Sequence, residues 1–551
     1  MANYTMRADG TAANKAAAED GDPAVQAECM SIATHGAETF SAGDVIMLAD
    51  TGGDYRATLT TPSAGSSGNE ITYEKYSGDT PILNGADLVA TWGVHDGSIY
   101  SATLTTQPKQ VFIDGNLGDR KTSIGACVAE YDWYWASNVL YLYAPGDPDT
   151  EYTTPGVEAC ARDYCISTSD GNDYIIFDGL TLRYSNRNGM GQASTDIPSN
   201  ITVKNCITEW NWYNGISPQG HTSYNFSDWL IEDNIARYNG ITGVGLMRCT
   251  GTNIIRRNTC YENGKYQSDQ AIDAAFTFAS GIKLFDVEAG SAPSGTEIYE
   301  NVCYDNGRGD VDSNKGQGVG IWLDACGLTD SDDTHRNVVH HNLIYGNSGN
   351  GIFLEITSYS SIYSNVVYDN GTQHEGNWGP CQMEIDSRQS FHSDYNHIYN
   401  NTFVVGRIGI RLYSYFQTAS TVSYNLVKNN ICAGQSVRVI QCSDGGDNVA
   451  WGSGNVYENN CFGAQFGGFL QWGNLSQLHD TYDSWETAHG EAWVQIEEDP
   501  SFTDAGSDDY ALAAGSPCIG AGINLGPPYD AALLPASSWP AAVVTGSQDD
   551  Y

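Results

Sequence analysis

An asparagine that recurs along the chain is the feature that most constrains how the chain can fold. Two small or apolar residues follow it in most copies, as in RRNTCYENG, YENVCYDNG and YSNVVYDNG, and turn residues come soon after. Apolar alternation on each side indicates strands, and long 3.6-residue periods are missing. The spacing of roughly 23 to 43 residues is typical of solenoids, and the copies are Asn205, Asn234, Asn258, Asn301, Asn342, Asn365, Asn401, Asn430 and Asn460.

We therefore predict an all-β fold, a single-stranded right-handed parallel β-helix with loop insertions and terminal caps. A solenoid grows in one dimension, so its 551 residues need not divide into several globular domains. Stacked asparagines at one turn can hydrogen-bond from coil to coil, which explains a polar residue at an inward corner. We assign residues 1–160 to an N-terminal cap, first coils and inserted hairpins, 161–475 to the β-helix core, and 476–551 to a C-terminal cap and tail.

Short strands within this repeat align without gaps: GIKLF from Gly281, GIWLD from Gly320, GIFLE from Gly351, QMEID from Gln382 and GIRLY from Gly409. Their second and fourth residues are aliphatic and are predicted to share the buried face, so the third and fifth point outward. The third positions form a column of Lys283, Trp322, Phe353, Glu384 and Arg411, and the fifth a column of Phe285, Asp324, Glu355, Asp386 and Tyr413. Because like charges side by side destabilise a sheet, the adjacent acids in the fifth column indicate a site.

Long loops flank the coils that carry these acids. They occupy Gly264–Ser280, Gly307–Gly318 and Gly371–Pro380, and a further insertion, CGLTDSDDTHRN, directly follows Asp324. Binding sites are commonly built from long loops on a rigid scaffold. We expect the acids to be bordered by substrate-binding side chains from strands and loops, namely Lys283, Trp322, Phe353, His374, Trp378, Glu384, Arg411 and Tyr413.

Aromatic and cysteine residues elsewhere allow two interpretations each. The hairpin that carries Trp133, Tyr134 and Trp135 either forms a sugar-binding platform or packs on the coil below. Several of the 14 cysteines occupy rungs where other coils have Val, Leu or Ile, which favours buried free thiols. In an exported protein, disulfides remain the alternative, with Cys160 and Cys165 or Cys326 and Cys381 as pairs.

Charge and hydropathy exclude some partners. The chain has 25 basic and 67 acidic residues and a net charge of −42, which argues against binding nucleic acid or an anionic membrane. No stretch approaches the roughly 18 apolar residues of a membrane span. The start, MANYTMRADG, lacks a basic-then-apolar signal region, so either a signal was removed or export uses another route. We expect a secreted or extracellular protein of open oligomeric state.

The acid column is compatible with several chemistries. Adjacent coils lie about 4.8 Å apart, so the carboxyls of Asp324 and Glu355 are expected at the separation of about 5 Å that retaining glycosidases use. Asp324 and Asp386 are expected about 10 Å apart, nearer the inverting arrangement. Alternatively, the acids bind calcium in a polysaccharide lyase that acts on a uronate-containing glycan, with Lys283 or Arg411 as base. A solvated acidic stripe, or a non-catalytic glycan-binding β-helix such as an adhesin or tailspike, is the remaining reading.

The chain resembles the right-handed β-helix repeat proteins of the pectate-lyase-like superfamily in its opening GDVIMLADTGGDYRATLT and its closing DPSFTDAGSDDYALAAGSPCIGAG. In addition, GIWLD followed one coil later by GIFLE is similar to the motif pair of β-helix glycosidases of the β-xylosidase type. That resemblance implies a retaining glycoside hydrolase acting on a polysaccharide or oligosaccharide, with Asp324 as nucleophile and Glu355 as acid/base, and no required cofactor. The DSDDTH insertion after Asp324 departs from the compact form of the motif.

Overall fold

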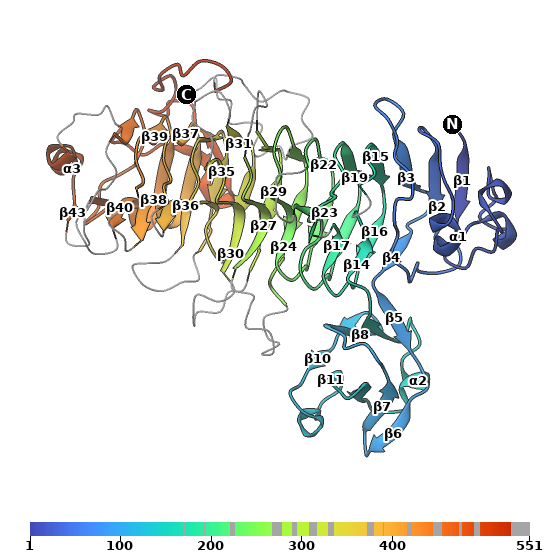
Figure 1. The fold of residues 1–551 in the computed structure, drawn as a ribbon. Helices are drawn as coiled ribbons and strands as arrows, with labels where there is room; N and C mark the ends of the chain where they lie inside the picture. Colours follow the sequence, from blue (N-terminus) through green and yellow to red (C-terminus); the bar gives the residue numbers. More distant parts are fainter. Residues whose placement is uncertain are drawn as a thin grey trace. The chain divides into compact units, whose positions relative to one another are not determined.

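A computed structural model describes the chain in two compact units. One unit contains Met1–His221, Asn234–Gly245 and Gly264–Thr277, and the other contains Thr222–Asp233, Leu246–Asn263 and Phe278–Tyr551. The described residues are 1–168, 171–191, 193–220, 226–266, 278–288, 295–307, 317–328, 336–371, 380–388, 391–415, 421–444, 454–472, 477–489 and 496–529. The predicted fold is confirmed: parallel strands stack coil upon coil as a right-handed parallel β-helix (Figure 1).

The first unit begins the solenoid with two runs of parallel strands. One run is β1 (Asn3–Met6), β2 (Val45–Leu48), β3 (Ile71–Lys75), β15 (Ile175–Asp178) and β19 (Ile201–Lys204). The other is β4 (Ile82–Asn84), β16 (Thr181–Arg183), β20 (Ile207–Glu209) and β23 (Ile235–Arg237). Shorter pairs are β14 (Tyr164–Ile166) with β17 (Asn188–Met190), and β18 (Ala193–Ser194) with β21 (Gln219–Gly220).

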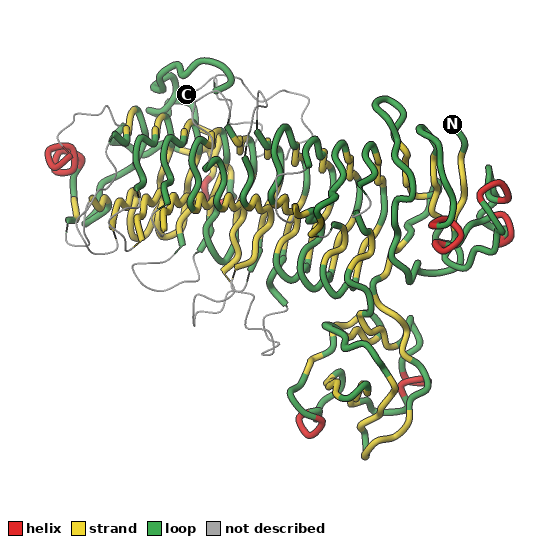
Figure 2. The backbone as a smooth tube through the Cα atoms, viewed as in Figure 1, coloured by secondary structure: helices red, strands yellow, loops and turns green. Residues whose placement is uncertain are grey.

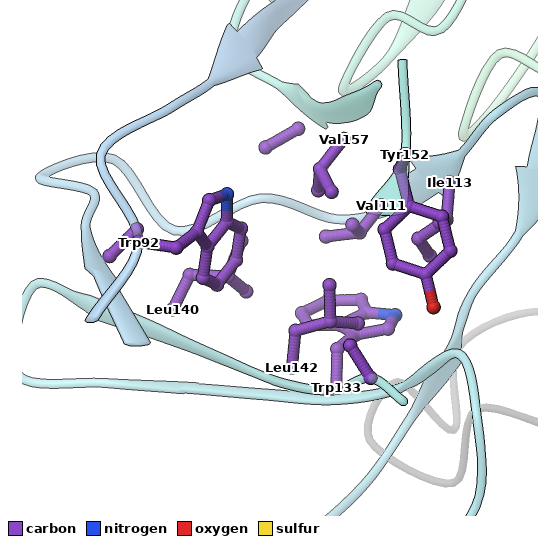
Figure 3. Packing of buried hydrophobic residues seen from close by; sticks show 11 residues of the cluster. Trp92, Val111, Ile113, Trp133, Leu140, Leu142, Tyr152 and Val157 are labelled. Atoms are coloured by element: carbon purple, nitrogen blue, oxygen red, sulfur yellow. The ribbon is translucent and has the colours of Figure 1, made fainter. Parts of the chain in front are cut away.

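Between β4 and β14 the chain forms an inserted module with its own core. One sheet contains β6 (Gly93–Asp96), β7 (Ile99–Thr103), β10 (Asp119–Arg120), β11 (Asp132–Ala136) and β12 (Val139–Tyr143). The other contains β5 (Ala86–Val89), β8 (Val111–Ile113), β9 (Asn116–Leu117) and β13 (Val157–Cys160). Trp92, Trp133, Leu140 and Leu142 point toward one another in this core (Figure 3).

The aromatic hairpin does not form the platform that was considered for it. Trp133 is fully buried in the module core, and the indole Nε1–H of Trp135 donates to the Leu104 carbonyl at 2.8 Å. The alternative prediction, that the hairpin packs on the coil below, is also wrong, because the rings of Trp133 and Trp135 pack within the inserted module. Tyr134 lies on the alternate side of the strand, where its ring stacks at 6.3 Å on that of Tyr141.

The second unit continues the solenoid in longer runs of parallel strands. On one side lie β22 (Leu230–Glu232), β25 (Ile254–Arg256), β28 (Glu297–Tyr299), β31 (Asn337–His340), β34 (Ser360–Tyr363), β37 (His397–Tyr399), β39 (Leu426–Lys428) and β41 (Val456–Glu458). A second run is β26 (Thr259–Tyr261), β29 (Val302–Tyr304), β32 (Leu343–Tyr345), β35 (Val366–Tyr368) and the start of β38 (Thr402–Tyr415).

A third run in this unit carries the predicted columns. It consists of β27 (Phe278–Phe285), β30 (Gln317–Asp324), β33 (Ile352–Glu355), β36 (Cys381–Arg388), the second part of β38, β40 (Ile431–Asp444) and β42 (Leu470–Trp472). Strands recur at corresponding places in successive coils, as the yellow segments of Figure 2 show. One remaining strand, β24 (Thr242–Met247), spans the division between the two units.

Helices are short and lie outside the coils. They are α1 (Ile32–Gly36), α2 (Pro148–Glu151), α3 (Tyr482–His489), and the 3-10 turns Lys15–Ala17, Gln26–Glu28, Ile124–Ala126 and Ala505–Ser507. In the described part of the chain no helix has the length and apolar character to cross a membrane. Helix α3 packs at the last coil. Its Trp485 contacts Tyr457 edge to face, and its Tyr482 contacts Phe469 in the same way.

The C-terminal tail adds three short strands and a strap, the described segment that ends at Tyr529. Strand β43 (Leu478–His479) pairs with β42, and β44 (Phe502–Asp504) pairs with β45 (Asp509–Leu512). Tyr529 then packs its ring against Tyr363 and Tyr399 and accepts at its carbonyl from the Asn400 side chain. The strap therefore binds the outer surface of the coils.

An asparagine ladder runs through the coils of the second unit. The Nδ2 of Asn301 donates to Asn342 Oδ1 at 3.0 Å, and the Asn301 backbone N–H donates to the same oxygen. The pattern repeats from coil to coil through Asn258, Asn301, Asn342, Asn365, Asn401, Asn430 and Asn460. A second ladder, which the repeat pattern did not indicate, runs through Asn263, Asn306, Asn347, Asn370 and Gln382.

The assignment of Asn205 to this ladder is wrong by one residue. Asn205 is exposed, has a φ of 53°, and donates to Asp178 in the turn. Cys206 takes the inward place, and its backbone N–H donates to Asn234 Oδ1 at 2.9 Å. In the first unit, therefore, Asn234 accepts a ladder bond from a backbone amide rather than from a second asparagine side chain.

The cysteines are the buried free thiols that the rung positions predicted. All 14 are free and buried, including the pairs Cys160 and Cys165, and Cys326 and Cys381. Cys260 and Cys303 stand in register on β26 and β29, where other coils place Ile344 and Val367. Their packing is that of small hydrophobic residues.

Replacing a ladder asparagine should destabilise the fold far more than replacing one in a turn. In Asn365→Leu, the backbone N–H of Asn342 and the carbonyl of Val339 lose a buried partner, and the Asn342 side chain loses one of its acceptors. Each unsatisfied group costs about 1–3 kcal/mol, so we expect a loss of about 3 kcal/mol or more in the free energy of unfolding, measured by urea denaturation. In the control Asn205→Gly, glycine keeps the positive φ, and the change should stay within about 0.5 kcal/mol. Equal losses would contradict the ladder's role.

Candidate active site

The predicted columns form because the strands of the third run pair in parallel and in register. One column reads Phe285, Asp324, Glu355, Asp386 and Tyr413, and the other reads Lys283, Trp322, Phe353, Glu384 and Arg411. The alternating residues Ile321, Leu323, Ile352 and Leu354 are fully buried inside the coil. Since neighbouring strands lie about 4.8 Å apart, Asp324 and Glu355 are direct neighbours on one face of one sheet.

The chain turns sharply away immediately after the first two acids. Ala325 has a φ of 56° and Ile356 a φ of 52°, and their backbone N–H groups donate to the carbonyls of Glu355 and Asp386 on the next coil. A left-handed conformation is costly for a β-branched residue such as Ile356 and is found chiefly where the surroundings enforce it. This turn ends β33 at Glu355.

Asp324 is held by a lysine from the preceding coil. The Lys283 ammonium lies 2.9 Å from Asp324 Oδ2 and only 3.2 Å from the centre of the Trp322 ring. Both members of the ion pair are largely buried, with 15% and 17% of their side chains exposed. Within the described residues, Asp324 Oδ1 makes no hydrogen bond, and Lys283 is the cation that pairs with this carboxylate.

Glu355 and Asp386 share one arginine. The Nε of Arg388 lies 3.1 Å from Glu355 Oε1 and 2.8 Å from Asp386 Oδ2. Glu355 is 12% exposed and Asp386 only 1%. Among the described residues, the other Asp386 oxygen, Oδ1, is buried without a hydrogen-bond partner.

Burial raises the pKa of both carboxyls. The pKa of Glu355 rises to about 7, because burial and the nearby Asp324 and Glu384 outweigh the lowering effect of Arg388 and Lys283. The pKa of Asp386 also rises to about 7, through burial and then through Glu384 and Glu355, against the opposing effect of Arg388. Both acids therefore hold protons in a range where a free carboxyl is ionised.

Glu384 and Arg411 form a second buried pair, below the acids in the other column. Arg411 donates from Nε at 3.0 Å and from its terminal nitrogen at 2.7 Å to Glu384 Oε1. The Asn350 amide donates to Glu384 Oε2 at 2.6 Å. Burial disfavours the charge on Arg411, but the neighbouring Cys381 and Glu384 outweigh this and raise its pKa. Arg411 is thus a fixed cation, which contradicts its candidacy as a catalytic base.

The aromatic residues of the columns are not open sugar platforms. Trp322 and Phe353 stack on each other at 5.6 Å and are 4% and 6% exposed. The Lys283 ammonium covers the face of Trp322, and Tyr413 is also buried. Stacking on a sugar by Trp322 and Phe353 is therefore not supported, because their rings already pack within the site. His374 and Trp378 lie outside the described residues, as does most of the loops expected around the site.

Two residues of the site were missed from the sequence. Arg388 follows Asp386 by two residues and so shares its face, a signal available from strand alternation if β36 had been extended past QMEID. Asn350 lies two residues before β33, and its side chain donates to Glu384 on the next coil. Its role could not be read from spacing.

The acids do not gather as metal ligands. In the described ranges no group of three or more His, Cys, Asp or Glu side chains is placed to hold a metal ion. The donor chemistry agrees, since Asp324, Glu355, Asp386 and Glu384 each contact a lysine or arginine within hydrogen-bonding distance. A calcium ion would have to displace these cations, so the residues present do not fit a calcium site.

Comparison with known proteins gives likeness at the level of fold. No protein-family profile and no curated protein matches the sequence. The structure of XylC in complex with xylose is similar over 91% of this chain and 87% of that chain, with a TM-score of 0.59 and 13% identity. A glycoside hydrolase matches at 10% identity and TM-score 0.48 over 84% of this chain and 96% of that chain. The Eubacterium ramulus GH136 lacto-N-biosidase matches with 12% identity and a TM-score of 0.39, over 83% of this chain and 67% of that chain.

Of these three structures, XylC has a TM-score above 0.5. At 13% identity it establishes the architecture and no more. The chain shares the parallel β-helix fold of XylC. This finding bears out the predicted membership of the β-helix class, while the chemistry has to be argued from the site itself.

Asp386→Asn should change stability in a pH-dependent way. With its pKa raised to about 7, folded Asp386 keeps a proton that the unfolded chain releases near pH 4, so ionisation opposes folding increasingly as pH rises between these values. Asparagine cannot ionise, so the variant escapes this cost. We expect its thermal midpoint, relative to wild type, to be more favourable at pH 8 than at pH 5. The same difference at both pH values would contradict the raised pKa.

Proposed function

We propose that the protein is a carbohydrate-active enzyme, a retaining glycoside hydrolase that cleaves an oligosaccharide or polysaccharide with Asp324 and Glu355. The observation that carries the proposal is that these acids are in-register neighbours that differ in their cation partners and in the effect of burial. Asp324 is paired with an ammonium group, whereas burial raises the pKa of Glu355 to about 7. Paired acids in unlike environments are the arrangement by which one carboxyl donates a proton while the other acts as an anion.

Each acid has a separate role in this proposal. Asp324 Oδ1 is the attacking atom, and it forms a bond to the anomeric carbon as the bond to the leaving oxygen breaks. Glu355 gives its proton to that oxygen, which takes the electron pair of the broken bond. In the second step Glu355 accepts a proton from water as the water oxygen replaces Asp324, and the anomeric configuration is retained.

The substrate is a glycan outside the cell in this proposal. The net charge of −42 disfavours a polyanionic glycan, and the cations of the site already pair with its own acids. Neutral glycosides are therefore the first to be tested. Xylosides belong in that panel because XylC, which has the same fold, was solved with xylose.

The lyase alternative has less support. It needs a base beside a uronate, but Arg411 is a buried, fixed cation and Lys283 is engaged by Asp324 and Trp322. A non-catalytic glycan-binding protein would not need a buried acid with a raised pKa beside an ion-paired acid, an arrangement that burial makes costly.

Substitution of the two acids should separate their roles. Asp324→Asn should lower turnover by several orders of magnitude on every glycoside, because no other group can form the glycosyl-enzyme. Glu355→Gln should be much less damaging on an aryl glycoside whose leaving group departs without protonation, and azide should restore its turnover with retained configuration. A matched control is Glu297→Gln on β28, whose acid pairs with His340 at 3.0 Å and should not affect activity. Inverted product, or azide rescue only in Asp324 variants, would reverse the assignment.

Chelation should distinguish hydrolase from lyase. Neither carboxyl role needs a metal, so we expect EDTA to leave release of reducing ends largely intact, with no ultraviolet absorbance from an unsaturated uronate. Lys283→Ala should weaken hydrolysis by exposing Asp324 to solvent without creating or removing metal dependence. Full calcium dependence together with unsaturated product would favour the lyase.

A further inference from the structure

The strand that carries Asp386 extends two residues past its acid, whereas the strands that carry Asp324 and Glu355 end at theirs. Strand β30 ends at Asp324 and β33 ends at Glu355, but β36 continues to Arg388. Arg388 is in register with Tyr415 on one side. On the other side the chain has already turned away at Ile356, so no residue of β33 stands opposite Arg388.

This extra length brings the Arg388 side chain over Glu355. Its Nε lies 3.1 Å from Glu355 Oε1 and donates to Asp386 Oδ2 at 2.8 Å. The contact engages Oε1 of Glu355, and within the described residues the other oxygen, Oε2, makes no hydrogen bond. The arginine is 36% exposed, whereas Asp386 behind it is 1% exposed. Asp386 therefore fixes Arg388 from inside the protein, and Arg388 fixes Glu355 at the surface of the site.

We propose that Arg388, fixed by Asp386, is a positioning residue that orients the Glu355 carboxyl and stabilises the anion formed when it gives up its proton. This inference rests on the proposed function. In the first step the proton leaves Glu355 for the glycosidic oxygen as the carbon–oxygen bond breaks. Glu355 then changes from neutral to negative while a guanidinium lies 3.1 Å away. Arginine suits this task because its planar group stays charged and can contact two carboxyls at once.

The effect on Glu355 has to be judged against all the charges that face it. They are Lys283 from β27, Asp324 from β30, and Glu384, Asp386 and Arg388 from β36. Lys283 already has its own acid in Asp324, and Glu384 already has Arg411. Arg388 is thus the cation that directly contacts Glu355 among the described residues.

The test compares Arg388→Met and Arg388→Lys with wild type on two glycosides, one with a poor leaving group and one with an activated aryl group. Loss of the guanidinium should lower kcat/KM about tenfold or more on the first substrate, the range of a weakened general acid, and much less on the second. Removing a positive charge also favours the neutral acid, so the alkaline limb of activity should move to higher pH in Arg388→Met. Arg388→Lys should keep the limb near that of wild type, because the charge remains.

Arg257→Met is the matched control. Arg257 also contacts two carboxylates, Glu232 at 2.6 Å and Asp233 at 2.8 Å, and is 27% exposed, but its acids are not those of the site. Arg257→Met should leave kcat/KM on both substrates and the pH profile of activity unchanged. Arg388→Met must keep its thermal midpoint for the comparison to hold. If that variant does not fold, Arg388→Lys together with Asp386→Asn decides the matter, because Asp386→Asn should lower activity on the poor leaving group only.

Equal losses on both substrates with an unmoved alkaline limb would overturn the inference and leave Arg388 as a structural residue. A limb that moves equally in Arg388→Lys would overturn it too, because charge would then not be the cause. These failures are distinguishable from failure of the proposed function. If the proposed function is wrong, the wild-type protein would cleave neither glycoside, or the loss of activity in Glu355→Gln would not depend on the leaving group.

Discussion

In-register stacking of parallel strands is the constraint on which the rest of this molecule depends. Each coil places one residue directly beside its counterpart on the next coil, so a position that recurs along the chain becomes a column in space. The asparagine ladders secure that register, because a slip would leave buried amides without partners. The acid column is a consequence of the same geometry that builds the scaffold.

That geometry brings together acids that repel one another, and the cations beside them offset this repulsion. Lys283, Arg388 and Arg411 each come from a strand of the same run and each contact an acid. Their unequal placement separates the acids chemically. Asp324 meets an ammonium, whereas Glu355 and Asp386 share a single guanidinium and lie deeper. Burial then favours the protonated form of the latter two.

Strand ends decide which side chains reach the site. The left-handed turns at Ala325 and Ile356 end two strands beside their acids, while β36 runs two residues further. Such strained turns in non-glycine residues are tolerated where neighbouring hydrogen bonds enforce them, here with the carbonyls of the next coil. Arg388 reaches Glu355 because β36 extends two residues past its acid, whereas β30 and β33 end at theirs.

The sequence by itself determined the β-helix class, the buried rungs, the free cysteines and the two columns, because strand alternation and a recurrent asparagine are local patterns that coil stacking converts directly into contacts. It misplaced Asn205 and missed Arg388 and Asn350. It also gave no sign that Trp322 and Phe353 stack on each other or that Arg411 pairs with Glu384. Pattern gives the face of a strand, but not the depth of a side chain or the partner that covers it. The burial of Glu355 and Asp386, the lysine over Trp322 and the arginine between two acids were decided only by tertiary structure, because each depends on where neighbouring coils end.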